Sequence, residues 1–211
     1  MPGKSKALMK ALEWVVAIDT PALVASVAAE RDYYPELNNN QLAAKGFAKA
    51  RWRASTTGAV TGLVSNPWVA LPAATLDTAV SLRTETVAAA RTAIIYDENF
   101  FDDENAEWEL LIPVFGIIIT SQFFREIGLQ SGKGLTRASI RKYLATNRLD
   151  VFKKTMLKYF GMKVTQKGLI TKTLPIVGGM IGGCWNYIEV GRVKNRSIKY
   201  FQPERQEEDE W

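Results

Sequence analysis

Apolar residues recur along most of this chain at the three- and four-residue spacing of an amphipathic helix. Between Lys6 and Ile18 the apolar positions include 7, 8, 11, 12 and 15, and this spacing predicts a helix. Asp19, Thr20 and Pro21 then supply a cap and a first-turn proline for a second helix that ends near Asp32. Strand-like alternation is scarce, so the pattern predicts an all-α fold in a single compact multi-helix domain.

Two longer helices are predicted next. The first runs from Gln41 to the Asn66-Pro67 step, because the residue before a proline is disfavoured in a helix. The second runs from Leu71-Pro72 to about Tyr96, with apolar positions 76, 80, 87, 90 and 94 on one side. Asp77 lies beside this stripe, and we interpret it as a first-turn carboxylate favoured by the helix dipole, with partial burial as the alternative.

Glycines spaced four residues apart mark two of the predicted helices. Each costs roughly 1 kcal/mol against alanine in a helix interior, so close packing of another backbone against the bare face must offset the cost. The first pair precedes Pro67, and the second set follows Pro175 in the apolar run 174–188. We predict that they form a helix-packing seam made of Gly58, Gly62, Gly178, Gly179, Gly182 and Gly183, with Gly178 and Gly182 against the segment of Gly58 and Gly62.

Acidic and apolar segments alternate in the middle of the chain. Asp97–Glu109 holds seven acidic residues and no basic one, which predicts a solvated loop and helix start. A divalent-cation site is the weaker alternative there, because the spacing is not that of an EF-hand loop. Leu110–Phe124 has the apolar character of a buried helix. The longest apolar runs, residues 110–120 and 174–188, fall short of the ~20 residues of a membrane span.

Positive charge is concentrated between Lys133 and Lys199. Fifteen Lys or Arg residues face only Asp150 and Glu189, a net charge of +13 against +5 for the whole chain. Such a region attracts anions, although a solvated basic face without a ligand is an equal alternative on charge alone. The residues that we expect to bind an anionic surface are Arg137, Arg141, Lys142, Lys153, Lys154, Lys158, Lys163 and Lys167. The interleaved aromatics Tyr143, Phe152, Tyr159 and Phe160 are expected in the core.

The residue inventory gives no catalytic or metal-binding constellation. The chain lacks histidine, the commonest general base and metal ligand, and its one cysteine excludes an intrachain disulfide or a thiolate cluster. Cys184 lies in an apolar helix and is expected to be an inert core thiol rather than a nucleophile. We therefore expect no enzymatic activity, no metal and no cofactor. Glu13 and Asp19 interrupt the apolar N-terminal stretch, so we expect a mature cytoplasmic protein.

Several of these segments together resemble the EcsC family. They are Leu71-Pro72 with Asp77, the helix end Ile94-Ile95-Tyr96-Asp97, the glycine-rich run Pro175–Tyr187 with Asn186, and Tyr200-Phe201. The resemblance covers roughly residues 40–202. It implies a mostly helical bacterial protein, from a family named for its association with an ABC-transporter operon and without an established enzymatic activity. On this basis we divide the chain into N-terminal helices (1–39), an EcsC-like helical domain (40–202) and an acidic tail (203–211) expected to be disordered.

Three functions remain for comparison with the structure. The first is a non-enzymatic protein that lies peripherally on the inner face of the cytoplasmic membrane or binds a lipid through its basic C-terminal half. The alternative is a protein-interaction or scaffold module, including a homo-oligomer, that docks through small-residue faces or the acidic tail. Nucleic-acid binding ranks third, because no recognised motif accompanies the charge and acidic segments oppose it.

Overall fold

The structure, a computed structural model, describes residues 2–61, 67–116, 137–145, 149–173 and 175–202. These residues form helices and connecting turns, with no strand among them, which confirms the all-α prediction. The helices are α1 (Pro2–Val16), α2 (Thr20–Tyr33), α3 (Asn39–Thr61), α4 (Pro67–Tyr96), the 3-10 turn η1 (Phe100–Asp102), α5 (Ala106–Glu109), α6 (Leu111–Phe115), α8 (Arg137–Ala145), α9 (Leu149–Thr173) and α10 (Pro175–Phe201).

Local sequence signals set most of the helix boundaries. The Asp19 carboxylate accepts a hydrogen bond from the Ala22 backbone N–H at 3.1 Å and caps α2 as predicted. The predicted start of α4 is wrong, because the helix begins at Pro67 rather than at Leu71-Pro72. A proline is tolerated at this first helical position, where its missing N–H would have no intrahelical partner. Asp77 consequently lies beyond the first turns of α4 and is 2% exposed, so the helix-dipole interpretation is wrong and the residue is buried.

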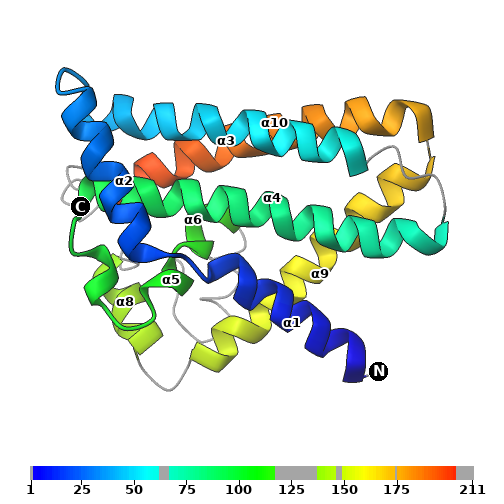
Figure 1. Cartoon of the computed structure of the whole chain (residues 1–211). Helices are drawn as coiled ribbons and strands as arrows, with labels where there is room; N and C mark the ends of the chain where they lie inside the picture. The colour runs from blue at the N-terminus through cyan, green and yellow to red at the C-terminus, as the bar shows by residue number, and fades with distance from the viewer. Residues whose placement is uncertain (1, 62–66, 117–136, 146–148, 174, 203–211) are drawn as a thin grey trace, which may run out of the picture.

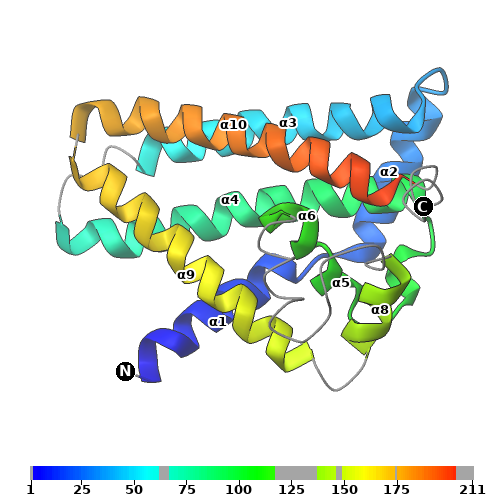
Figure 2. The same ribbon diagram turned by 180° about the vertical axis from the view of Figure 1, so that it is seen from behind.

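The long helices α3 and α10 run antiparallel, side by side, with α4 packed along them (Figure 1 and, from behind, Figure 2). The side-chain amide of Asn186 in α10 donates a hydrogen bond of 2.9 Å to the backbone oxygen of Ala54 in α3, which fixes their relative register. Gly58 lies on α3, and Gly178, Gly179, Gly182 and Gly183 lie on α10. Gly62 and the side-chain surroundings of the other five lie outside the described part, so the glycine seam stays a prediction.

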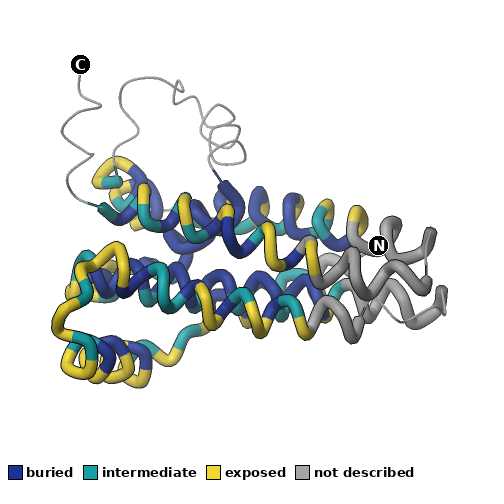
Figure 3. Tube along the Cα trace, turned by 90° about the horizontal axis from the view of Figure 1, so that it is seen from above, coloured by how far each residue is buried: buried dark blue, intermediate teal, exposed yellow. Residues whose placement is uncertain are grey.

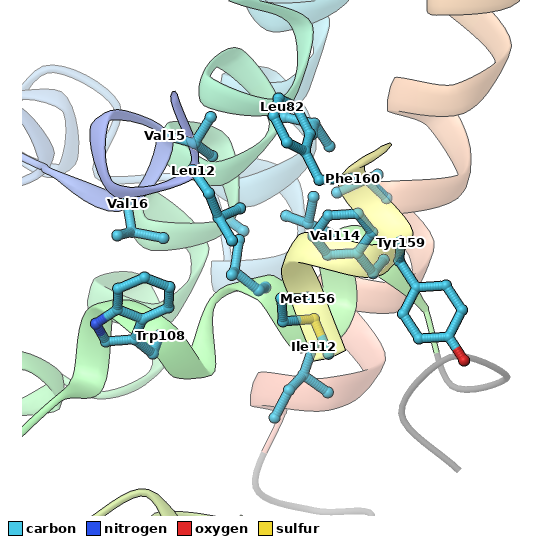
Figure 4. Packing of buried hydrophobic residues seen from close by; sticks show 14 of the residues in the cluster. Leu12, Val15, Val16, Leu82, Trp108, Ile112, Val114, Met156, Tyr159 and Phe160 are labelled. Atoms are coloured by element: carbon cyan, nitrogen blue, oxygen red, sulfur yellow. The ribbon is translucent and has the colours of Figure 1, made fainter. Parts of the chain in front are cut away.

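Helix α1 crosses α9 and α4 on the other side of the bundle and shares their core (Figures 1 and 2). Leu12 and Val15 of α1 are fully buried in one apolar cluster with Met156 and Phe160 of α9 and with Trp108 (Figure 4). The predicted core positions of the basic region are confirmed, since its four aromatics are 0–9% exposed: Tyr143, Phe152, Tyr159 and Phe160. Helix α1 therefore packs into the same hydrophobic core as α4 and α9.

A second cluster holds α2 against the opposite end of α4. Leu23 and Val27 of α2 pack with Ile94, Phe100 and Phe201. Nearby, the Glu30 carboxylate of α2, 9% exposed, pairs with two basic side chains from other helices, Arg91 of α4 and Lys49 of α3, the latter at 3.4 Å. Viewed from above, buried positions follow the inner sides of the described helices and exposed positions follow the outer sides (Figure 3). Side chains on those outer surfaces are the ones available for binding.

Candidate functional site

The most concentrated charge in the described structure is a cluster around Glu109, the last residue of α5. Glu109 is 0% exposed, and its two carboxylate oxygens accept hydrogen bonds from two arginines of α8, one turn apart. Arg137 Nε lies 2.8 Å from Oε1, and Arg141 Nε lies 3.0 Å from Oε2. The acidic segment was predicted as a solvated loop, and for Glu109 that prediction is wrong, because the carboxylate ends a short helix packed under α8.

Two aspartates and two aromatic rings complete this cluster. Both arginines reach Asp97 Oδ2 at 3.2 Å, and Arg141 also pairs with Asp103. The Cζ atoms of both arginines lie 5.2 Å from the centroid of the Phe100 ring, within the range of a cation–π contact. Among the described residues no group of three or more Asp, Glu, Cys or His could hold a metal ion. Three of the seven acids of this segment, Asp97, Asp103 and Glu109, pair with the arginines of α8.

Two groups at this cluster, Arg141 and Tyr200, have shifted pKa values. Burial would lower the pKa of Arg141, but the charges of Glu109 and Asp103 and the hydrogen bonds to Glu109 and Asp97 outweigh it, and the pKa is raised. Burial, followed by the negative charge of Glu109, raises the pKa of Tyr200 well above 10, so its phenol stays neutral. Neither group exchanges a proton near neutral pH, and the cluster acts as a structural clamp between α8 and the end of α4.

The prediction that Arg137 and Arg141 bind an external anionic surface is corrected by this geometry. Their side chains are only 12% and 26% exposed, and their N–H groups already donate to internal carboxylates. Lys163 is likewise engaged, at 3.4 Å from Glu189 Oε1, and the Lys153 ammonium lies 4.5 Å from the centroid of the Trp108 ring. The net charge of +13 for residues 133–199 includes these four cations. Composition alone cannot show that the fold places them against carboxylates and aromatic rings of the same chain.

Three of the predicted residues remain available at the surface: Lys142 on α8 and Lys154 and Lys158 on α9. The side chain of Lys167 lies outside the described part. Helix α1 adds two exposed lysines next to α9, Lys6 and Lys10. The two helices touch where Leu8 lies 3.9 Å from the position a Cβ would take on Gly161. Lys158 is three residues from Gly161, whereas Lys6 and Lys10 are rotated by about 160° from Leu8 around α1. We call Lys6, Lys10, Lys154 and Lys158 together the lysine face; two exposed acids, Glu13 and Asp150, lie one turn from Lys10 and Lys154.

Exposed apolar side chains accompany the lysine face. On α9, Val151 and Met162 are 44% and 47% exposed, and they lie three or four residues from Lys154 and Lys158, on the same side of the helix. On α1, Trp14 is 44% exposed and lies one turn after Lys10. Sequence reasoning placed Leu76 of α4 in a buried stripe, but it is 63% exposed. The error arises because periodicity identifies an apolar side without showing how far a neighbouring helix extends over it.

Cys184 is also corrected: it is exposed on α10 and is not a core thiol. Buried carboxylates of α4, Asp77 and Glu85, face the interior at 2% and 1% exposure. A groove with an apolar lining lies between α1 and α4, and neither of these acids nor Cys184 is among its lining residues.

Comparison with protein-family models, with curated proteins and with solved structures found no match. The resemblance to the EcsC family therefore stays a prediction. Within the described residues one segment, Lys6–Tyr33, contains an 18-residue window with the mean hydropathy (1.5) of a membrane span, and 28% of that window is buried. In the fold this segment is divided between α1 and α2 by the non-helical residues 17–19, and its N-terminal half packs against α4 and α9.

Proposed function

We propose that this protein is a non-enzymatic helical protein that binds peripherally to an anionic membrane surface through the lysine face on α1 and α9. The observation that carries the proposal is the pairing of four exposed lysines with exposed Val151, Met162 and Trp14 on two adjoining helices. Lysines attract an anionic lipid surface, and neighbouring apolar side chains enter its interfacial layer. This surface replaces the broader basic half predicted from the sequence.

The expected strength of this association is modest. Each Lys near an anionic surface contributes about 1 kcal/mol, so four give on the order of 4 kcal/mol at most, a sum that the exposed acids Glu13 and Asp150 reduce. Burial of partly exposed Val, Met and Trp side chains in the interface adds to this. Because the attraction falls off within a Debye length of about 8 Å at 0.15 M salt, binding is expected to weaken as salt is added.

The test is flotation with vesicles of phosphatidylglycerol and phosphatidylcholine, against vesicles of phosphatidylcholine alone. Lys154→Gln with Lys158→Gln is expected to reduce flotation with the anionic vesicles. The matched control, Arg192→Gln with Lys199→Gln, also removes two exposed positive charges but does so on α10, and it is expected to float like the unaltered protein. Equal flotation with both vesicle types, or equal loss in both double variants, would contradict the proposal.

A protein-interaction module is the second candidate, and a different surface favours it. Trp52 on α3 is 75% exposed, and Tyr187 and Ile188 on the adjoining helix α10 are 49% and 52% exposed. The Arg51 guanidinium lies 4.6 Å from the centroid of the Tyr187 ring, so an aromatic and cationic surface runs along the α3–α10 pair. Exposed Trp, Tyr and Arg are the residues that most often dominate binding energy at protein interfaces. Light scattering that shows a dimer in the unaltered protein and a monomer in Trp52→Ala would support this candidate, and a monomer in both would count against a homo-oligomer.

A further inference from the structure

A groove runs between α1 and α4, beside the lysine face. Its volume is 450 Å³, and it is lined by Ala11 and Trp14 of α1 and by Thr75, Leu76 and Ala79 of α4. This volume lies within the range of about 300–1,000 Å³ that is usual for small-molecule sites. The lining offers one hydroxyl, that of Thr75, and is otherwise apolar side chain. Such a lining suits a hydrocarbon chain, because it leaves no buried polar group of the ligand to be matched.

The rim of the α1–α4 groove is basic. The guanidinium of Arg83, one turn beyond Ala79 on α4, lies 4.5 Å from the centroid of the Trp14 ring and donates to the backbone oxygen of Trp14. This contact holds the indole as one wall of the groove and places a positive charge at its edge. Lys10 lies one turn before Trp14 and is exposed. Glu13, an exposed acid, is rotated by about 100° from Trp14 around the helix axis but lies one turn after Lys10, on the same side of α1 as that lysine.

We propose that the α1–α4 groove takes one acyl chain of an anionic membrane phospholipid, with Lys10 and Arg83 beside the headgroup. This inference rests on the proposed function, because the groove shares helix α1 with the lysine face that would hold the protein on the bilayer. A lipid acyl chain that leaves the bilayer to enter the α1–α4 groove stays close to the membrane surface and passes the exposed side chains of Trp14 and Leu76. The groove thereby gives the membrane-bound state a specific contact in addition to the charge attraction.

The experiment reads the environment of the groove directly. In the Cys184→Ser background, Leu76→Cys at the lip of the groove and Trp52→Cys on α3 are each labelled with an environment-sensitive fluorophore. The two sites are matched, since both native side chains are large, apolar and more than 60% exposed. With phosphatidylglycerol vesicles, the probe at position 76 is expected to brighten severalfold. With the same vesicles made from lipid whose acyl chains carry nitroxide labels, its fluorescence is expected to be quenched. The probe at position 52 is expected to show neither change.

A groove-filling variant separates chain uptake from simple immersion. Ala11→Phe, or the smaller change Ala11→Leu if the first lowers thermal stability, is expected to abolish most of the quenching at position 76 while flotation persists. Quenching that is unchanged by filling the groove would overturn the inference, as would flotation without quenching at position 76, and in both cases the proposed function would stand. Absence of flotation would instead remove the proposed function and this inference with it. Brightening at position 76 with rising protein concentration and no vesicles would show a second copy in the groove and overturn the lipid assignment.

Discussion

Replacing Glu109 by glutamine tests whether the buried cluster at α8 stabilises the fold. In the unaltered protein the Nε atoms of Arg137 and Arg141 lie 2.8 and 3.0 Å from the Glu109 carboxylate oxygens. The change removes the negative charge between the two arginines and places an amide N–H₂ group against one of these Nε–H donors. Removing one partner of a buried ion pair typically costs 3–5 kcal/mol, because the remaining charge stays in a poorly solvated site. Arg137, at 12% side-chain exposure, cannot readily turn to solvent. We therefore expect a loss of about 3–5 kcal/mol in the free energy of unfolding.

The loss is measurable by thermal and urea unfolding followed by circular dichroism. For a chain of this size 1 kcal/mol shifts Tm by roughly 2–4 °C, so Tm should fall by about 6–20 °C. Glu104→Gln, an exposed residue of the same acidic segment, is the control and should leave Tm nearly unchanged. Combining Glu109→Leu with Arg137→Leu should restore part of the loss, because the orphaned charge is removed as well. A decrease below about 1 kcal/mol in Glu109→Gln would refute the view that the cluster is desolvated and stabilising.

Three further changes test other contacts of the fold. Burial alone would raise the pKa of Glu189, but the positive charges of Lys163 and Arg196 lower it. The stability that the Glu189 carboxylate supplies is therefore present above its unfolded pKa of about 4.3 and is lost as pH falls through the lower pKa of the folded state. The deficit of Glu189→Gln in urea unfolding should therefore be constant near neutral pH and shrink under acidic conditions, and a pH-independent deficit would contradict the ion pair. Asn186 is 2% exposed, and Asn186→Ala removes the donor of its hydrogen bond to the Ala54 backbone oxygen. The free energy of unfolding in urea should fall by about 1–3 kcal/mol. An unchanged urea midpoint would place that amide in solvent. Gly116→Ala should lower Tm, because φ is +91° at this position and an added Cβ would lie 2.5 Å from a guanidinium nitrogen of Arg196. An unchanged Tm would mean that the turn after α6 relaxes without cost.

Helix content was predictable from this sequence, because its causes are local. Apolar spacing identified α1, and the Asp19 side chain and Pro21 identified the start of α2. The start of α4 was missed because two prolines, at 67 and 72, give the same local signal, and only the packing of the whole helix distinguishes them.

Surface charge was less predictable, because the availability of a cation depends on residues far away in sequence. Arg137 and Arg141 meet Glu109 across about 30 positions, and Lys163 meets Glu189 across 26. A charge count along the chain assigns all of these side chains to a basic region that attracts anions. The fold instead uses them internally and leaves lysines of α9 and of α1, a helix outside that region, at the surface. The sequence analysis therefore named two of the four lysines of the lysine face, Lys154 and Lys158, and missed the two on α1.

The position of α1 has a consequence for how the chain is made. Its fully buried residues Leu12 and Val15 pack in one cluster with Met156 and Phe160, about 145 positions later in sequence. During synthesis at a typical 5–20 residues per second, the apolar side of α1 must wait about 7–30 s before α9 is available to cover it. The nascent chain is therefore expected to present that side of α1 to chaperones, or to a nearby bilayer, until α9 has been made.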